Sequence, residues 1–353
     1  MSEIERCSLE DIPALFELFG EVYKHNPRLQ EIDYFNWQFL ENPYHQEDEY
    51  SFWVERHNSQ ITGFLGYSPL EFVYRGNISM GCWTYNWYSS HSNGAGLKLM
   101  YKLWEQFDNR FYIGLSEASV NVYNYLRVPL LKKMPRWIGI IDSKKAVSLF
   151  DIGKKDTKEK FLSSENTINR SNGITDISPV SIFDTSIEYS FDNWSNLEGY
   201  VRRTGEFLNW RYFKIPGHNY KAIIGGDNSF AVYRIEKIMG REESVIKIID
   251  WNFNADLAEN ALAYIAGEGL DSGAVLIDFF CTASDVETLF SPLGLFSEES
   301  IAERIPHLFR PLNNFFDRIS LAIDLPPHMK SRNIDFSKWY ISRGDGDIDR
   351  IKL

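Results

Sequence analysis

Asn36-Trp37-Gln38-Phe39 returns later in the chain as Asn209-Trp210-Arg211-Tyr212. The two blocks lie 173 residues apart, which is close to half of the 353-residue chain. Ser8 and Ser181 each stand 29 residues before the tryptophan of their block. Agreement in both residue type and spacing indicates that one fold unit has been duplicated. Because only one copy has to keep the chemistry, differences between the copies should point to the site.

Length and composition favour two domains that do not bind nucleic acid. A chain of 353 residues exceeds the ~250–300 residues at which a single core stops growing. The apolar fraction of 44% is ordinary, whereas 15% aromatic residues suggests wide aromatic surfaces. The net charge of −12 and the lack of a long basic run disfavour nucleic-acid binding. A local basic patch could still hold a phosphorylated small molecule.

The cysteines and the start of the chain favour a cytoplasmic protein. Cys7, Cys82 and Cys281 are far apart and form no CxxC motif, so we interpret them as reduced thiols. The first residues lack the basic and apolar regions of a signal peptide. No apolar run approaches the ~20 residues of a membrane span.

Periodicity predicts an α/β (α+β) protein made of two units that each contain helices and strands. In the first unit we expect helices at 8–24, 36–39, 97–107 and 120–126, and strands at 50–55, 61–66, 81–88 and 111–115. In the second unit we expect helices at 186–196, 202–212, 257–266 and 285–290, and strands at 222–224, 229–235, 244–251 and 274–280. The expected divisions are a domain at 1–150, a polar linker or insertion at 151–176, a second domain at 177–326 and a tail at 327–353.

A glycine-bearing turn, residues 91–96, lies between strand 81–88 and helix 97–107. Backbone N–H groups and partial positive charge at a helix start favour a phosphate there, and glycine allows close approach. The same strand–turn–helix arrangement also occurs in α/β domains that bind nothing. In the second unit the matching turn reads Asn252-Phe253-Asn254-Ala255-Asp256, without glycine and with an acid that would repel an anion. We therefore expect that only the first copy binds a phosphate.

The turn and the element order resemble the acyl-CoA pyrophosphate loop and fold of the GNAT superfamily of N-acyltransferases. Gly94 and Gly96 match its two small positions, and His91 stands where Arg or Gln is usual. The resemblance implies two tandem GNAT-like domains, each a mixed, mostly antiparallel sheet flanked by helices. It also implies acyl-CoA as co-substrate, with no metal. The residues that it assigns to CoA binding are Trp87, Tyr88, Ser89, His91, Ser92, Asn93, Gly94, Ala95 and Gly96.

The resemblance also implies direct attack of an amine on the thioester. Backbone N–H groups where the two central strands separate, near Trp87, would polarise the carbonyl. Tyr125 is the candidate acid for the leaving thiolate, although a tyrosine there could equally pack on the sheet. The base stays open among His91, Glu117 and an aspartate of the tail, with Asp345 as the choice from the tail. We expect Trp83, Tyr85 and Trp87 on one face of their strand, which turns Cys82 away and disfavours a cysteine nucleophile.

The duplicated block and the arginines near it supply the candidate residues for binding the acceptor. Arg202, Arg203 and Arg211 form a basic cluster that could bind phosphate or form an ion-paired surface. Tandem GNAT chains with such a block resemble N-acyltransferases of bacterial surface-polysaccharide (O-antigen) pathways, which implies acetyl or 3-hydroxyacyl transfer to a dTDP-linked amino sugar. The candidate acceptor residues are Asn36, Trp37, Arg203, Arg211 and Tyr212. Packing is the competing interpretation of Trp37 and Trp210. Other acceptors (an aminoglycoside, peptide or aminoacyl group), a non-catalytic CoA-binding module and a homodimer remain open.

The tail contains Trp339-Tyr340 and alternating aspartates from Asp345 onward. A calcium loop would need glycine at its sixth position, where this chain has Arg350, so no metal is expected. The tail is either a disordered acidic segment or folds back onto the site.

Overall fold

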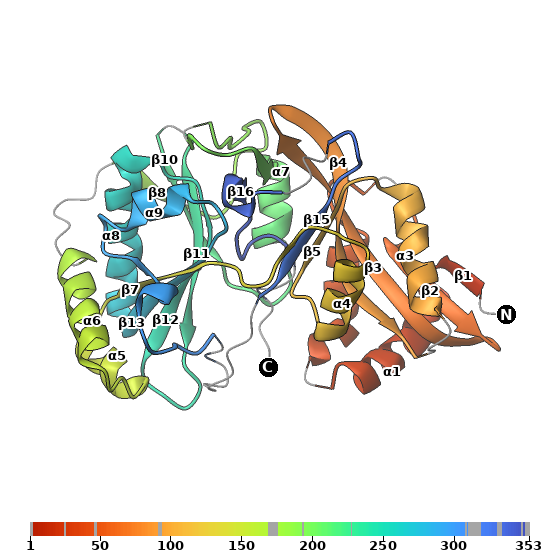
Figure 1. The fold of residues 1–353 in the computed structure, drawn as a ribbon, viewed down its shortest axis with the longest axis horizontal. Coiled ribbons are helices and arrows are strands. Elements are labelled where there is room, and N and C mark those ends of the chain that lie inside the picture. Colours follow the sequence, from red (N-terminus) through yellow and green to blue (C-terminus); the bar gives the residue numbers. More distant parts are fainter. Residues whose placement is uncertain are drawn as a thin grey trace.

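The computed structural model describes residues 3–24, 26–45, 48–90, 94–168, 176–192, 194–226, 228–307, 309, 319–329, 334–346 and 349. Two mixed sheets stand side by side, each with helices packed on it (Figure 1). Apolar side chains from both halves form one continuous core cluster between the sheets, which includes Phe19, Phe72, Trp210 and Phe230. The prediction of two α/β units is confirmed.

The first sheet has the strand order β1-β2-β3-β4-β5-β15-β6, and β9 joins it by pairing with β3 and β16. Its strands are β1 (Glu3–Arg6), β2 (Phe52–His57), β3 (Gln60–Tyr74), β4 (Asn77–Ser89), β5 (Arg110–Ile113), β6 (Leu130–Leu131), β9 (Gly199–Val201), β15 (Leu321–Asp324) and β16 (Trp339–Tyr340). The helices on it are α1 (Ile12–Val22), α2 (Ile32–Phe39), α3 (Ala95–Gln106) and α4 (Glu117–Tyr125).

The second sheet has the order β14-β7-β13-β12-β11-β10-β8. Its strands are β7 (Arg136–Ile140), β8 (Ile177–Val180), β10 (Lys221–Gly225), β11 (Phe230–Lys237), β12 (Ser244–Trp251), β13 (Ala274–Phe280) and β14 (Phe296–Ser297). Its helices are α5 (Ser143–Leu149), α6 (Lys155–Ile168), α7 (Gly205–Leu208), α8 (Ala255–Asp271) and α9 (Asp285–Phe290), with a π-helical turn at Asn209–Phe213. Short 3-10 turns lie at Leu9–Asp11, Pro27–Gln30, Glu298–Ser300 and Phe336–Lys338.

The two sheets exchange strands, so the expected boundary at residue 150 does not separate them. β7 lies before that boundary but pairs with β13 in the second sheet. β15, near the end of the chain, pairs with β5 and β6 in the first sheet. Figure 1 shows these two segments crossing between the halves in opposite directions. The expected polar linker at 151–176 contains helix α6, whose Phe161 side chain is buried in the second domain.

Strand β4 changes face midway, which corrects the expectation that its aromatic residues share one face. Trp83 and Tyr85 pack in the core toward α2, whereas Trp87 packs in the cluster with α3. The register shifts between Phe64 and Gly66 of β3, opposite Asn86, which has φ +48°. One extra residue in a strand reverses the side-chain alternation beyond it. β12 has a matching shift opposite Val232 and Tyr233 of β11.

Two local expectations had different outcomes. The hairpin at Asn58-Ser59 is confirmed, since both residues have positive φ and join β2 to β3. The helix expected at 186–196 is wrong in the described residues. Asp184 instead accepts hydrogen bonds from the backbone and side chain of Ser186 and so favours a turn. No helix in the described part of the chain is sufficiently long and apolar to cross a bilayer.

The duplicated blocks meet at the centre of the molecule. The rings of Trp37 and Trp210 are stacked with centroids 5.1 Å apart. Trp37 Nε1 donates to the Trp210 carbonyl at 2.8 Å, and Trp210 Nε1 donates to the Trp37 carbonyl at 2.9 Å. These reciprocal bonds relate the two copies by an approximate two-fold axis, and they support packing as the main role of both tryptophans.

Candidate functional site

The first candidate feature is the point where β4 and β5 separate, here called the first splay. Their parallel pairing ends at Thr84 and Tyr112, and β4 continues to Ser89. Helix α3 starts directly after Gly94, which has φ +82° and offers no side chain to cap the helix. Trp87 Nε1 donates to the Gly96 carbonyl at 3.0 Å and so holds the first turn of α3, which includes Ala95, against β4.

Other residues assigned to CoA already have protein contacts. Ser89 Oγ donates to Glu55 Oε2 at 3.0 Å, and the Glu55 side chain is buried. The Tyr88 ring lies against Phe64, with centroids 5.4 Å apart. His91, Ser92 and Asn93, which were expected to contact the pyrophosphate, lie outside the described residues. Among the described residues, the assignment of CoA binding therefore depends on the backbone of the first turn of α3 and on the Trp87 ring.

Helix α4 presents a different tyrosine to the sheet from the one expected. Tyr125 is 87% exposed, whereas Tyr123 is 1% exposed and packs 4.4 Å from the Tyr112 ring and 6.4 Å from the Trp87 ring. Residues two apart on a helix point in nearly opposite directions. Burial raises the pKa of Tyr123 well above its usual value, so its phenol stays protonated. Glu117 is exposed in the first turn of α4 and does not contact the core.

The second sheet has the same divergence, here called the second splay, but the chain fills it. Pairing of β12 with β13 ends at Ile248 and Phe279. The segment 340–346 enters between the two strands. There Gly344 N donates to the Ile249 carbonyl at 2.9 Å, and Ser342 forms a bridge with Cys281. The tail therefore docks, and it closes the second copy's equivalent of the first splay.

The start of α8 is closed as well. Asn254 is its N-cap, and the side-chain oxygen accepts from Asp256 N at 3.0 Å and Leu257 N at 3.2 Å. An anion at this helix start would have to displace those bonds. The expected loss of a phosphate site from the second copy thus has a structural basis in Asn254 as well as in Asp256.

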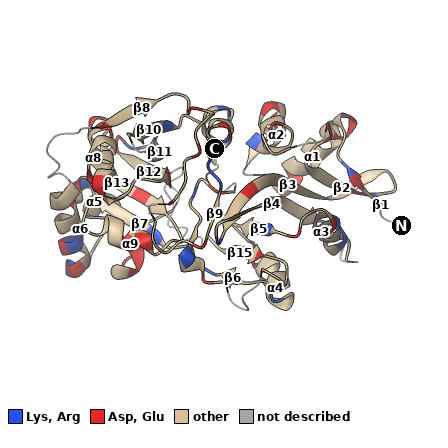
Figure 2. Cartoon of the chain, turned by 90° about the horizontal axis from the view of Figure 1, so that it is seen from above, with Lys and Arg blue, Asp and Glu red and all other residues tan. Residues whose placement is uncertain are grey.

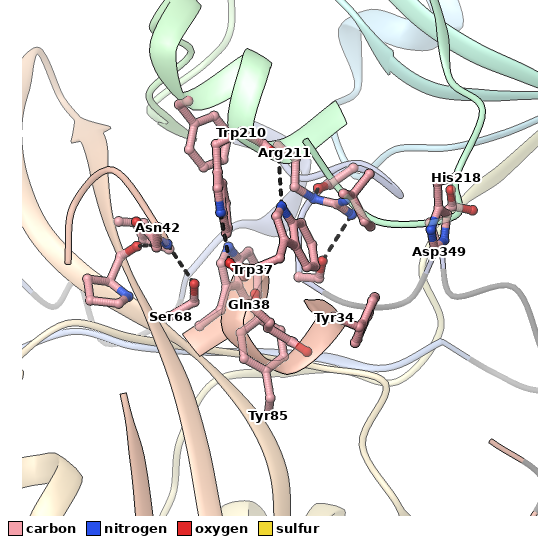
Figure 3. A pocket seen from close by; sticks show the side chains of 17 residues that line it. Tyr34, Trp37, Gln38, Asn42, Ser68, Tyr85, Trp210, Arg211, His218 and Asp349 are labelled. Carbon is pink, nitrogen blue, oxygen red and sulfur yellow. Dashed lines mark hydrogen bonds between the residues drawn. The ribbon is translucent and has the colours of Figure 1, made fainter. Parts of the chain in front are cut away.

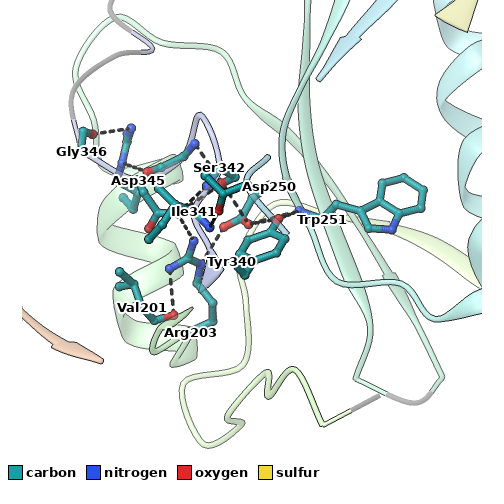
Figure 4. A network of polar contacts seen from close by, with 12 residues as sticks. Val201, Arg203, Asp250, Trp251, Tyr340, Ile341, Ser342, Asp345 and Gly346 are labelled. Atoms are coloured by element: carbon teal, nitrogen blue, oxygen red, sulfur yellow. Dashed lines mark hydrogen bonds and ion pairs between the residues drawn. The ribbon is translucent and has the colours of Figure 1, made fainter. Parts of the chain in front are cut away.

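A buried polar network fixes the tail (Figure 4). Arg203 Nε and Nη2 pair with Asp250 at 2.8 Å and with Asp345 at 2.9 Å, and these three side chains are 0% exposed. Burial raises the pKa of Asp345 and Asp250 adds to the rise, against the opposing effect of Arg203. Tyr212 and Tyr340 also donate to Asp250, at 2.7 and 2.8 Å. Arg203, Tyr212 and Asp345 are therefore enclosed, so they do not contact an acceptor or act as its base.

A cavity lies between the domains, beside the tryptophan stack (Figure 3). It contains about 480 Å³ of space between atoms, open solvent included. Its lining residues are Tyr34, Trp37, Gln38, Asn42, Ser68, Pro69, Leu70, Trp83, Tyr85, Phe207, Trp210, Arg211, Ile215, His218, Gly344, Gly346 and Asp349. Of the five expected acceptor residues, the structure brings Trp37 and Arg211 to this cavity. Asn36 accepts from Tyr50 Oη at 2.7 Å and does not line it.

The expected basic cluster is largely neutralised. Arg202 pairs with Glu71 at 2.6 Å and with Glu188 at 2.5 Å. Arg203 is held by Asp250 and Asp345, as described above. Arg211 donates instead to two tail carbonyls, Gly344 O at 2.9 Å and Gly346 O at 3.2 Å. The cluster therefore offers one guanidinium to a ligand rather than three.

The described residues include all three cysteines. All three thiols are buried and unbridged, and burial raises the pKa of Cys7 to about 12. Such thiols are poor nucleophiles at neutral pH. The described residues contain no group of three or more His, Cys, Asp or Glu side chains that could hold a metal ion.

The two sheets, each with a bulged strand and a splay, have the architecture of two GNAT-like domains in tandem. A GCN5-related N-acetyltransferase from Anabaena variabilis shares it with TM-score 0.56 and 13% identity, over 91% of this chain and 72% of that one. Saccharomyces cerevisiae N-myristoyltransferase, solved with bound myristoyl-CoA and inhibitors, has a TM-score of 0.54 and 11% identity, over 96% of this chain and 84% of that one. A probable N-acyltransferase from Enterococcus faecalis has a TM-score of 0.54 and 11% identity, over 84% of this chain and 70% of that one. At these identities the likeness shows the fold. No family model and no curated protein matches the chain.

Proposed function

We propose that the protein transfers an acyl group from acyl-CoA to the amine of a nucleotide-linked amino sugar of the dTDP type. The observation that carries acyl-CoA binding is the contrast between the two splays. The second is filled by the tail, and its helix start is capped by Asn254. At the first splay, no backbone hydrogen bond among the described residues joins β4 beyond Thr84 to the segment after β5. The N-cap residue there, Gly94, has no side chain that could cap the helix.

The bulge at Asn86 supports a meeting of the two substrates on β4. Trp87, on the α3 side, packs against the helix start that would hold CoA. Tyr85, two residues earlier, lines the cavity on the α2 side. A thioester from one side and an amine from the other would converge where the strand changes face. Direct attack would then need positioning and carbonyl polarisation by backbone N–H groups, with no covalent enzyme intermediate.

The acceptor part of the proposal rests on the cavity. Its aromatic lining suits stacking on a sugar or a base, and Arg211 suits an anionic group. Tyr123 replaces Tyr125 in our proposal as the acid that protonates the leaving thiolate. Its phenol is buried beside Trp87, whereas Tyr125 lies in solvent.

A thiol-release assay tests the reaction. Acetyl-CoA and 3-hydroxyacyl-CoA would be offered with a panel of dTDP- and UDP-linked amino sugars and unlinked amines. Release with a nucleotide-linked amine supports the proposal, and no release with any amine overturns it. Retention of CoA without turnover would instead favour a CoA-binding module.

CoA placement is tested with two matched glycines. Gly94 has φ +82° and Gly240, in the second domain, has φ +76°, and neither has an atom within 4 Å of an added Cβ. Gly94→Trp and Gly240→Trp therefore impose the same backbone strain. We expect calorimetric CoA affinity to fall at least about tenfold for Gly94→Trp only, because a side chain blocks close approach of the phosphates. Equal affinities for the two variants would refute CoA binding at the first splay.

A further inference from the structure

The interdomain cavity contains a buried guanidinium that forms no ion pair with a carboxylate of the described residues. Arg211 is 5% exposed, and its Nη1 atom has no hydrogen-bond partner in the described structure. Its contacts through Nε and Nη2 are to neutral carbonyls of the tail. Arg203 is different, since two carboxylates lie within 3 Å of it. Burial lowers the pKa of Arg211, whereas nearby tyrosines and Asp349, which also lines the cavity, raise it. The two oxygens of Asp349 are held by Arg234 and Tyr220 and form no ion pair with Arg211. A buried guanidinium without a carboxylate in contact is unfavourable, so Arg211 points to an anionic ligand.

One more N–H donor lines the same cavity. Trp83 Nε1, on β4, is buried and has no partner in the described structure. His218 Nδ1 contacts both the donor Arg28 Nη1, at 2.8 Å, and the acceptor Pro216 O, at 3.1 Å. These contacts call for opposite tautomers of the neutral ring, so they do not make Nε2 an N–H donor. That Nε2 atom is buried and without a partner in the described structure. Burial lowers the pKa of His218 to about 4, which keeps the ring neutral near pH 7.

The duplication explains why the cavity contains one guanidinium. Gln38 and Arg211 occupy the same position in their blocks, one residue after the stacked tryptophans. The approximate two-fold axis brings both into one cavity. Gln38 Oε1 is also buried and has no partner in the described structure. The Gln38 amide can accept from a hydroxyl or amine, whereas Arg211 can only donate. A ligand with an anionic end and a neutral or donor end therefore fits this arrangement.

We propose that the cavity binds an oxyanion, a carboxylate or a phosphate, through Arg211 Nη1 and Trp83 Nε1, and that the acceptor amine carries this group. The inference rests on the proposed function only in calling the ligand the acceptor. It narrows the acceptor to an anionic amine and opposes a polycation such as an aminoglycoside, whose charge Arg211 would repel.

Calorimetry on the full-length protein tests anion binding without requiring turnover. The probes are glucosamine, glucosamine 6-phosphate, 2-amino-2-deoxyglucuronate, dTDP, inorganic phosphate and acetate. We expect the anionic sugars to bind roughly 10–100-fold tighter than glucosamine, as one or two charge-assisted hydrogen bonds would give. If glucosamine 6-phosphate binds more tightly than 2-amino-2-deoxyglucuronate, the oxyanion is a phosphate, and the reverse order identifies a carboxylate. Equal affinity for the three sugars, or no binding of any anion at millimolar concentration, overturns the proposal.

Variants separate the anion site from tail docking. Arg211→Gln installs the residue of the first copy and should abolish the preference for anionic sugars. Trp83→Phe keeps a ring and does not touch the Arg211 contacts to the tail, and it should weaken anion binding several-fold. Arg202→Gln is the matched control, because that guanidinium already has two carboxylate partners. An unchanged preference in both Arg211→Gln and Trp83→Phe would refute the site.

The two proposals fail in different ways. Anion binding without thiol release would refute acyl transfer and leave the oxyanion site intact. Acyl transfer to uncharged amines, with no preference for anionic ones, would refute the oxyanion site and leave the transferase activity intact.

Discussion

Removal of either reciprocal hydrogen bond at the tryptophan stack should destabilise the whole protein. Trp37→Phe deletes the donor to the Trp210 carbonyl, and Trp210→Phe deletes the donor to the Trp37 carbonyl. Trp37 lies in the last turn of α2, where carbonyls lack partners within the helix. A buried carbonyl left unpaired costs about 1–3 kcal/mol, and the smaller ring loses about 1 kcal/mol of packing. We expect each variant to lose about 2–4 kcal/mol, with nearly equal values.

Urea denaturation followed by circular dichroism measures these losses. Trp137→Phe is the control, because Trp137 is a buried tryptophan whose Nε1 has no partner in the described structure, so its loss reports ring packing alone. The double variant Trp37→Phe/Trp210→Phe should depart from additivity by about 0.5–1.5 kcal/mol, since the stack is shared. A loss no greater than that of Trp137→Phe, or markedly unequal single losses, would show that the reciprocal bonds do not hold the halves together.

Three further outcomes can be measured. Burial would raise the pKa of Asp278, but Arg136 lowers it from 3.8 to about 2, so the native state loses about 2 kcal/mol as pH falls through this range. Unfolding curves measured from pH 5 to 2 should show this loss of stability, and Asp278→Asn should flatten the dependence of stability on pH. The same slope in the variant would contradict the role of Asp278. Arg203→Met leaves two buried carboxylates unpaired and should lower the free energy of unfolding in urea by about 3–5 kcal/mol. A change near zero would show that the network is solvated. Tyr123→Phe should lower kcat about 100-fold or more in the thiol assay, and a comparable loss in Tyr125→Phe alone would restore the sequence-based choice.

Features fixed by local chemistry could be predicted from the sequence. The hairpin at Asn58-Ser59 requires only two residues that tolerate positive φ. The duplication and the two-unit α/β fold follow from spacing and periodicity. The contrast between Gly94 and Asn254 at the two helix starts is likewise visible in the chain.

Features decided by distant partners could not be predicted. Strand alternation says which residues are buried but not which sheet a strand joins, so the exchange of β7 and β15 was not foreseen. Arg203 seemed available to a ligand because its partner Asp345 lies 142 residues away. The bulge at Asn86 moved Trp87 to the other face, and its only local signal is an asparagine that tolerates positive φ.

The choice of tyrosine on α4 could be only half made from the sequence. Helical spacing places Tyr123 and Tyr125 on opposite sides, so at most one of them can contact the sheet. Val120 stands three residues before Tyr123, and Val122 stands three before Tyr125, so apolar spacing does not distinguish the two sides. The missing information was which side of the helix faces β5.

The exchange of β7 and β15 also bears on how the chain is made. β15, the strand that pairs with β5 in the first sheet, ends at Asp324 of a 353-residue chain. During synthesis the first sheet therefore lacks β15, and the later strand β16, until every strand of the second sheet has been made. Meanwhile β5 exposes an unpaired edge, which is the kind of surface that aggregates or recruits chaperones. The first sheet is thus completed only after the strands of the second.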